Sequence, residues 1–144
     1  KAAEIVLNEI GCPINIQIQY SETASTGSGI TIWAVFAKNE EINSNNPVRL
    51  GASALGEKGK EAEKVGEEAA FALKKEIESE AAVDSHLADQ LIPFMALLPG
   101  SKMQTSAITN HTKSNIHVVQ KVMNRAFQMN NTEIVSMEPV IKGL

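Results

Sequence analysis

His111 lies in a polar stretch directly ahead of a helical pattern, a position from which a histidine can do chemistry on phosphate. Residues 109–114 are polar, and apolar residues recur at helical spacing from Ile116 onward. We therefore expect His111 just outside a helix N-terminus, with Thr112 or Ser114 capping the first turn. Such a helix end attracts anions, and imidazole is a good nucleophile, so the pattern favours phosphoryl or nucleotidyl transfer. A solvated histidine without a function is the alternative.

A second polar group occurs in residues 83–98, which read as an amphipathic helix. His86, Asp89 and Gln90 come within one turn of it and offer a ring, a carboxylate and an amide to one patch. Taken alone, this pattern is also typical of the exposed edge of a surface helix. A metal site built on His86 and Asp89 is a further interpretation of the same residues.

Several stretches of the sequence together match one known family. They are Gly56-Glu57-Lys58, Ala81-Ala82-Val83, the run from His86 to Leu97, His111, and Asn115-Ile116. In these stretches the chain resembles the RNA 3'-terminal phosphate cyclase family. The likeness covers the segment from Gly56 to Val119 and fades after Met123.

The resemblance implies an ATP-dependent ligase that converts an RNA 3'-phosphate to a 2',3'-cyclic phosphate. In this family the reaction passes through an adenylated histidine and then an RNA-adenylate. The resemblance implies that His111 takes the AMP, and that His86, Asp89 and Gln90 contact the adenosine part of ATP. It also implies two partners, ATP and an RNA 3' end, and a divalent metal, Mg or Mn, whose ligands we expect outside this sequence.

The length of the chain bounds what it can do by itself. Its 144 residues, 43% of them hydrophobic, can form one modest core or two small ones. Family members are much longer, and the chain begins with Lys1 inside the apolar stripe of an expected helix. We therefore expect the C-terminal part of a longer enzyme, which needs the N-terminal part of that enzyme as its partner and is inactive alone.

Charge and cysteine content exclude some classes of protein. A formal net charge of −4 leaves no basic stripe, so the chain does not look like a protein that tracks a nucleic-acid backbone. A single cysteine, Cys12, excludes an intrachain disulfide. No apolar run reaches membrane length, so we expect no membrane partner and a cytoplasmic, or alternatively nuclear, location.

Periodicity predicts an α/β chain of the α+β kind with two domains. Residues 1–55 read as one helix over 2–10 and three strands over 14–20, 30–37 and 48–55. By resemblance, this domain is part of the family's insert domain.

Residues 56–144 form the second expected domain, one α/β repeat of the family's catalytic core by resemblance. Their pattern predicts a long amphipathic helix from residue 57 to residue 77, a second helix over 87–98 and a strand over 103–108. A helix over 116–123 and a hairpin of strands over 126–129 and 134–137 follow.

Two further hypotheses compete with a catalytic cyclase. One is a cyclase-like, non-catalytic scaffold of ribosome assembly, and the other is an unrelated soluble α/β binding domain. His111 separates the first of them from the enzyme, because non-catalytic relatives are expected to lack the nucleophile.

Overall fold

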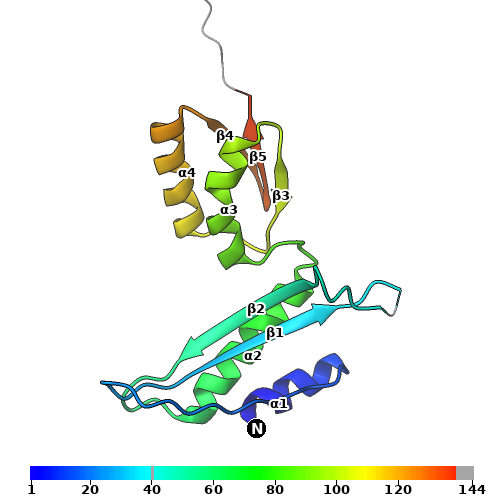
Figure 1. Cartoon of the computed structure of the whole chain (residues 1–144), viewed down its shortest axis with the longest axis vertical. Coiled ribbons are helices and arrows are strands. Elements are labelled where there is room, and N and C mark those ends of the chain that lie inside the picture. Colours follow the sequence, from blue (N-terminus) through cyan, green and yellow to red (C-terminus); the bar gives the residue numbers. More distant parts are fainter. Residues whose placement is uncertain (40, 139–144) are drawn as a thin grey trace, which may run out of the picture. The chain divides into compact units, whose positions relative to one another are not determined.

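The computed structural model describes residues 1–39 and 41–138, which form two compact units (Figure 1). The first unit is Lys1–Glu78, and the second begins at Ser79. Each unit combines helices with a small antiparallel sheet and has its own buried cluster of apolar side chains. This content confirms the predicted α+β class.

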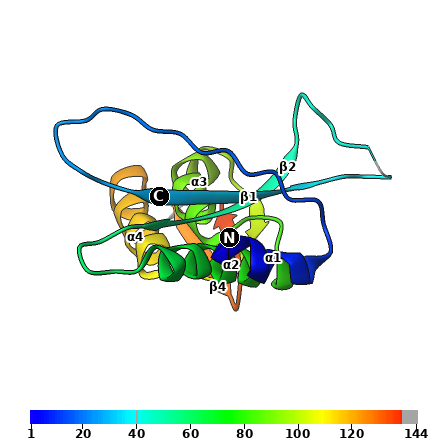
Figure 2. The same ribbon diagram turned by 90° about the horizontal axis from the view of Figure 1, so that it is seen from below.

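The first unit pairs a β-hairpin with two helices, and both helices lie on one side of the two strands (Figure 2). Leu50 and Ala52 of the hairpin are buried against Ala70 and Leu73 of the longer helix. The elements are α1 (Ala2–Leu7), a 3-10 turn η1 (Asn8–Ile10), β1 (Gly29–Phe36), β2 (Val48–Leu55) and α2 (Ala62–Glu78).

The strands predicted at residues 30–37 and 48–55 are confirmed, whereas the strand predicted at 14–20 is wrong. Residues 14–20 carry the alternating pattern but form no strand, and Ile16, Ile18 and Tyr20 are 55%, 77% and 92% exposed. A strand needs a neighbouring ladder of hydrogen bonds as well as alternation. Within the described residues, β1 pairs with β2 alone.

Helix α2 belongs to the first unit, so the chain divides after Glu78 and not at 55/56 as predicted. The change in composition after residue 56 marks the start of an amphipathic helix whose apolar face covers the preceding strands.

Lys74 of α2 also forms an ion pair with Glu9, with 2.6 Å between nitrogen and oxygen. Its hydrogen bond and its charge lower the pKa of Glu9, and the same bond raises the pKa of Lys74. The assignment of the two parts to the family's insert domain and catalytic core stays a prediction.

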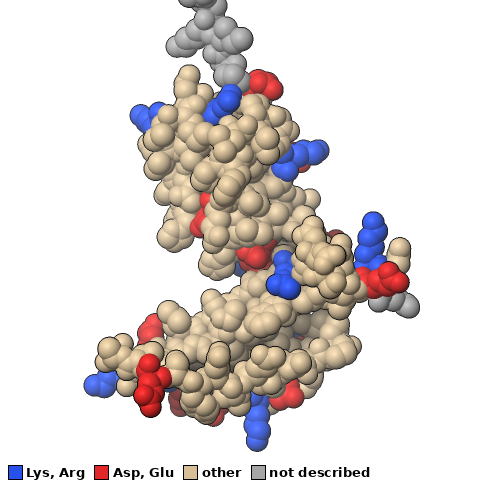
Figure 3. Space-filling view, viewed as in Figure 1, with Lys and Arg blue, Asp and Glu red and all other residues tan. Residues whose placement is uncertain are grey.

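On the face shown in Figure 3, the basic and acidic side chains are scattered, and no continuous basic patch is visible on it in either unit. In the part of the chain that the structure describes, no helix combines the length and apolarity needed to cross a membrane.

The second unit consists of two helices packed on a three-stranded antiparallel sheet of order β3-β5-β4. The predicted hairpin is confirmed, and the strand predicted at 103–108 is shorter than expected. The elements are α3 (Ser85–Leu97), β3 (Lys102–Gln104), α4 (Asn110–Met123), β4 (Ala126–Asn130) and β5 (Glu133–Met137).

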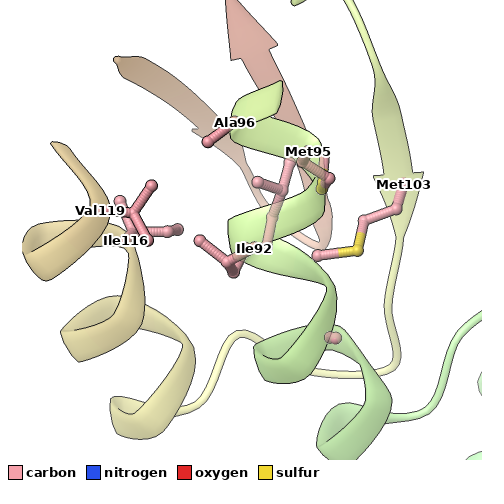
Figure 4. Packing of buried hydrophobic residues seen from close by; sticks show 8 residues of the cluster. Ile92, Met95, Ala96, Met103, Ile116 and Val119 are labelled. Carbon is pink, nitrogen blue, oxygen red and sulfur yellow. The ribbon is translucent and has the colours of Figure 1, made fainter. Parts of the chain in front are cut away.

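The core of this unit lies between α3, α4 and the sheet. Ile92 of α3 and Ile134 of β5 are completely buried. Figure 4 shows Ile116 and Val119 of α4 pointing toward α3, while Met103 reaches toward the same helix from β3. Burial of these side chains holds the two helices together.

We expect Ile92→Ala to lower the free energy of unfolding of the second unit by about 2 to 5 kcal/mol, because it leaves a cavity in this core. Leu97→Ala is the matched control: it truncates a side chain of the same helix that is 63% exposed, and its effect should stay within about 0.5 kcal/mol. Amide hydrogen exchange of α3 and α4 measures both changes. Equal effects of the two substitutions would contradict this packing.

Candidate functional site

Asp84 fixes the beginning of α3. Its carboxylate accepts hydrogen bonds from the backbone N–H groups of His86 and Leu87, at 3.0 and 2.7 Å. This is the N-cap arrangement that acidic residues favour. It places His86 in the first turn, where the side chain is exposed, and Asp89 about one turn later, where it is half-buried.

Thr109 fixes the beginning of α4, three residues earlier than Thr112, one of the two predicted caps. The Thr109 hydroxyl accepts from the N–H of Thr112 at 3.1 Å, and the two hydroxyls lie 3.0 Å apart. The predicted caps Thr112 and Ser114 are therefore wrong, and His111 lies inside the first turn. The polar composition of this turn hid the helix start, because polar residues do not show helical periodicity.

The hydrogen bonds of the first turn of α4 locate the positive end of this helix. The N–H groups of Thr112 and Lys113 both bind Thr109, that of Lys113 at 3.1 Å to the Thr109 carbonyl oxygen. The N–H groups that precede the first helical hydrogen bond belong to Asn110 and His111. The positive end of α4 is therefore at His111 itself.

A short parallel bridge brings the beginnings of α3 and α4 together. Val83 pairs with Thr105, and its N–H donates to the Gln104 carbonyl at 3.2 Å. The Ser106 N–H donates to the Val83 carbonyl, also at 3.2 Å. The segment before α4 is thereby joined to the segment before α3.

The two helices lie side by side and run in the same direction (Figures 1 and 4). The Asn115 side-chain amide donates to the Asp89 carbonyl at 3.0 Å, and His111 is one turn before Asn115. The structure thus brings the predicted residues His86, Asp89, Gln90 and His111 to the N-terminal halves of two neighbouring helices. Their roles in binding and catalysis stay predictions.

A metal site on this helix pair has no support in the geometry. In residues 1–39 and 41–138 there is no group of three or more His, Cys, Asp or Glu side chains that could hold a metal ion. Two ligands from His86 and Asp89 fall short of the usual protein sites.

Two residues of the site carried no predicted role. Thr109 could have been identified as the cap from its spacing to Thr112, since an N-cap hydroxyl binds the N–H three residues later. The contact between Asn115 and Asp89 joins residues far apart in sequence, so periodicity could not predict it.

Comparison with known proteins identifies the family of this chain. The model of the family described as RNA 3'-terminal phosphate cyclase matches residues 2–129. The chain therefore belongs to the RNA 3'-terminal phosphate cyclase family. The match extends past Met123, where the likeness was expected to fade.

Curated relatives support the same conclusion. The RNA 3'-terminal phosphate cyclase of Pyrococcus furiosus is 40% identical over 129 residues, which are 90% of this chain and 35% of that protein. The Caldivirga maquilingensis protein of the same name is 41% identical over 137 residues, 91% of this chain and 36% of the relative. The Archaeoglobus fulgidus protein of that name is 38% identical over 135 residues, with 93% and 37% covered. The chain spans about a third of the length of the relatives it matches.

We expect Thr109→Ala to destabilise α4 by about 0.5 to 2 kcal/mol, because the Thr112 N–H loses its partner. Thr109→Ser keeps the hydroxyl and serves as the matched control. Amide exchange of residues 112–116 measures the effect. Equal protection in the alanine and serine variants would show that Thr109 does not cap this helix.

Proposed function

We propose that the natural polypeptide carrying this sequence is an ATP-dependent RNA 3'-terminal phosphate cyclase that uses His111 as its nucleophile. The observation that carries the proposal is the exposed His111 in the first turn of α4, beside the helix that bears His86, Asp89 and Gln90, in a member of this family. The scaffold hypothesis is less favoured, because this chain keeps a histidine where the nucleophile is expected.

In the first proposed step, a ring nitrogen of His111 attacks the α-phosphorus of ATP. The N–P bond forms as the bond between the α-phosphorus and the bridging oxygen breaks, and pyrophosphate leaves. The free N–H groups at the beginning of α4 lie next to this ring and favour negative charge there. Because AMP is held on His111 as a covalent intermediate, its transfer from ATP to RNA is split into steps with lower barriers.

The next two steps move AMP and then release it. An oxygen of the RNA 3'-phosphate attacks the phosphorus of the histidine adduct, the P–N bond breaks, and an RNA-adenylate forms. The terminal 2'-hydroxyl oxygen then attacks the phosphorus of the 3'-phosphate, loses its proton to a base or to water, and displaces AMP. The product is the 2',3'-cyclic phosphate.

The side chains of α3 suit the nucleoside part of ATP. The exposed His86 ring can lie against the adenine base, although less fully than a larger aromatic ring. The Asp89 carboxylate can accept hydrogen bonds, and the Gln90 amide can donate or accept them. These residues would orient ATP relative to His111.

The negative charge of the triphosphate must also be neutralised. We assign this role to residues outside those that the structure describes. A divalent metal, Mg or Mn, would supply it when bound, and no step above depends on a metal held by α3 or α4. We therefore expect the 144 residues alone to bind ATP weakly and to form no adenylate.

In the natural polypeptide, His111→Ala and His111→Asn should each abolish covalent labelling by ATP that carries the label in its α-phosphate. Neither side chain can form the phosphoramidate. The wild-type adduct should be stable in alkali and labile in acid, as a P–N bond requires. Persistence of the label in His111→Ala would contradict the assignment of His111 as the nucleophile.

His86→Ala should weaken the use of ATP but leave some labelling, because one contact to adenine contributes only about 1 to 3 kcal/mol. Asp89→Ala should be more severe if its carboxylate orients the nucleotide or the His111 ring. Rates of labelling across a range of ATP concentrations measure both. Wild-type rates in both variants would remove α3 from the ATP site.

A further inference from the structure

Helix α3 contains a proline one turn after Asp89. Pro93 lies inside the helix and has no N–H, so it cannot donate the usual helical hydrogen bond to the carbonyl four residues before it. That carbonyl belongs to Asp89. The proline ring also crowds the same carbonyl. The Asp89 carbonyl therefore lacks its usual helical donor and can accept a hydrogen bond from outside its own helix.

Asn115 supplies that donor from α4. Its side-chain nitrogen lies 3.0 Å from the Asp89 carbonyl oxygen, and the residue is half-buried. Asn115 follows His111 by one turn, so it lies on the same side of α4. This hydrogen bond joins the helix of the proposed nucleophile to the helix of the proposed ATP contacts.

We propose that Asn115 is a positioning residue, which fixes His111 relative to α3 through the carbonyl that Pro93 leaves without a partner. This inference rests on the proposed function of His111. The apolar contacts between the helices, such as Ile92 with Ile116, are non-directional and tolerate small sliding movements. A hydrogen bond is directional in distance and angle, so it specifies one register of α4 along α3.

The register matters because nucleophilic attack requires close and aligned atoms. A displacement of about 1 Å at the reacting centre can slow a reaction by about 100-fold. Asn115 touches neither ATP nor RNA in this proposal. Its effect should therefore appear in the rate of adenylation at saturating ATP.

Four variants of the natural polypeptide test the proposal: Asn115→Ala, Pro93→Ala, the double variant, and Gln120→Ala as control. Pro93→Ala restores an N–H four residues after Asp89, so the carbonyl gains a partner within α3. Gln120→Ala removes a half-buried amide from the same helix. For each protein, the single-turnover rate of His111 adenylation at saturating ATP and the thermal midpoint are measured.

Asn115→Ala should lower the adenylation rate by about 10- to 100-fold and should also lower the thermal midpoint, because a carbonyl loses its donor. Adding Pro93→Ala should restore the midpoint but leave the rate low, since the bond between the helices is still absent. Pro93→Ala alone should keep the wild-type rate, because a carbonyl oxygen can accept two hydrogen bonds and Asn115 still binds it. Gln120→Ala should also keep the wild-type rate.

Recovery of both the rate and the midpoint in the double variant would overturn the proposal, because Asn115 would then only stabilise the fold. A wild-type rate in Asn115→Ala would overturn it as well. If Asn115→Ala does not fold, the double variant is compared with Pro93→Ala, in which the carbonyl has a helical partner in both proteins. Absence of His111-AMP in the wild type would instead refute the proposed function, and the positioning role with it.

Discussion

The contact between α3 and α4 is the constraint on which the proposed site depends, because its residues come from both helices. Two kinds of interaction maintain that contact. Ile92 and Ile116 bury apolar surface in a shared core, in which Ile134 of the sheet also takes part. The hydrogen bond from Asn115 to the Asp89 carbonyl adds a directional link near the predicted nucleotide contacts. Burial supplies most of the stability, and in the proposed positioning role the polar link specifies the register.

The caps of the two helices determine which residues stand at the site. Asp84 begins α3 just before His86, and Thr109 begins α4 just before His111. A helix that started a residue later would leave a different side chain in the first turn. The parallel bridge between Val83 and Thr105 holds the two preceding segments side by side. The caps and the bridge thus place the two first turns together, and in α4 the N–H groups of Asn110 and His111 precede the first helical hydrogen bond.

Sequence patterns predicted where the helices and strands lie better than they predicted which elements pair or pack together. The apolar spacing of α2 was a clear signal, because it reflects burial of one face of that helix. The alternating residues Ile16, Ile18 and Tyr20 wrongly predicted a strand, since a strand also requires hydrogen bonds to a neighbouring strand. The boundary between the two compact units differs from the predicted one for a related reason. Composition changes where a new element begins, whereas a compact unit ends where its internal contacts end.

The same distinction applies to the site. His111, His86, Asp89 and Gln90 could be selected from residue types and from the family resemblance, and helical spacing placed the last three together. The start of α4 was missed because its first turn is polar. The link from Asn115 to Asp89 spans 26 residues and is a tertiary contact. Its one local signal is Pro93, which follows Asp89 at the spacing of a helical hydrogen bond.

The most direct test of the account is a crystal structure of the natural polypeptide with a non-reactive ATP analogue. In that structure we expect the α-phosphorus about 3 to 3.5 Å from a ring nitrogen of His111, as a near-attack geometry requires. We also expect the adenosine to lie against the first turns of α3, with the Asn115 amide still bound to the Asp89 carbonyl. A nucleotide bound away from this helix pair, or a His111 ring directed away from the α-phosphate, would contradict it.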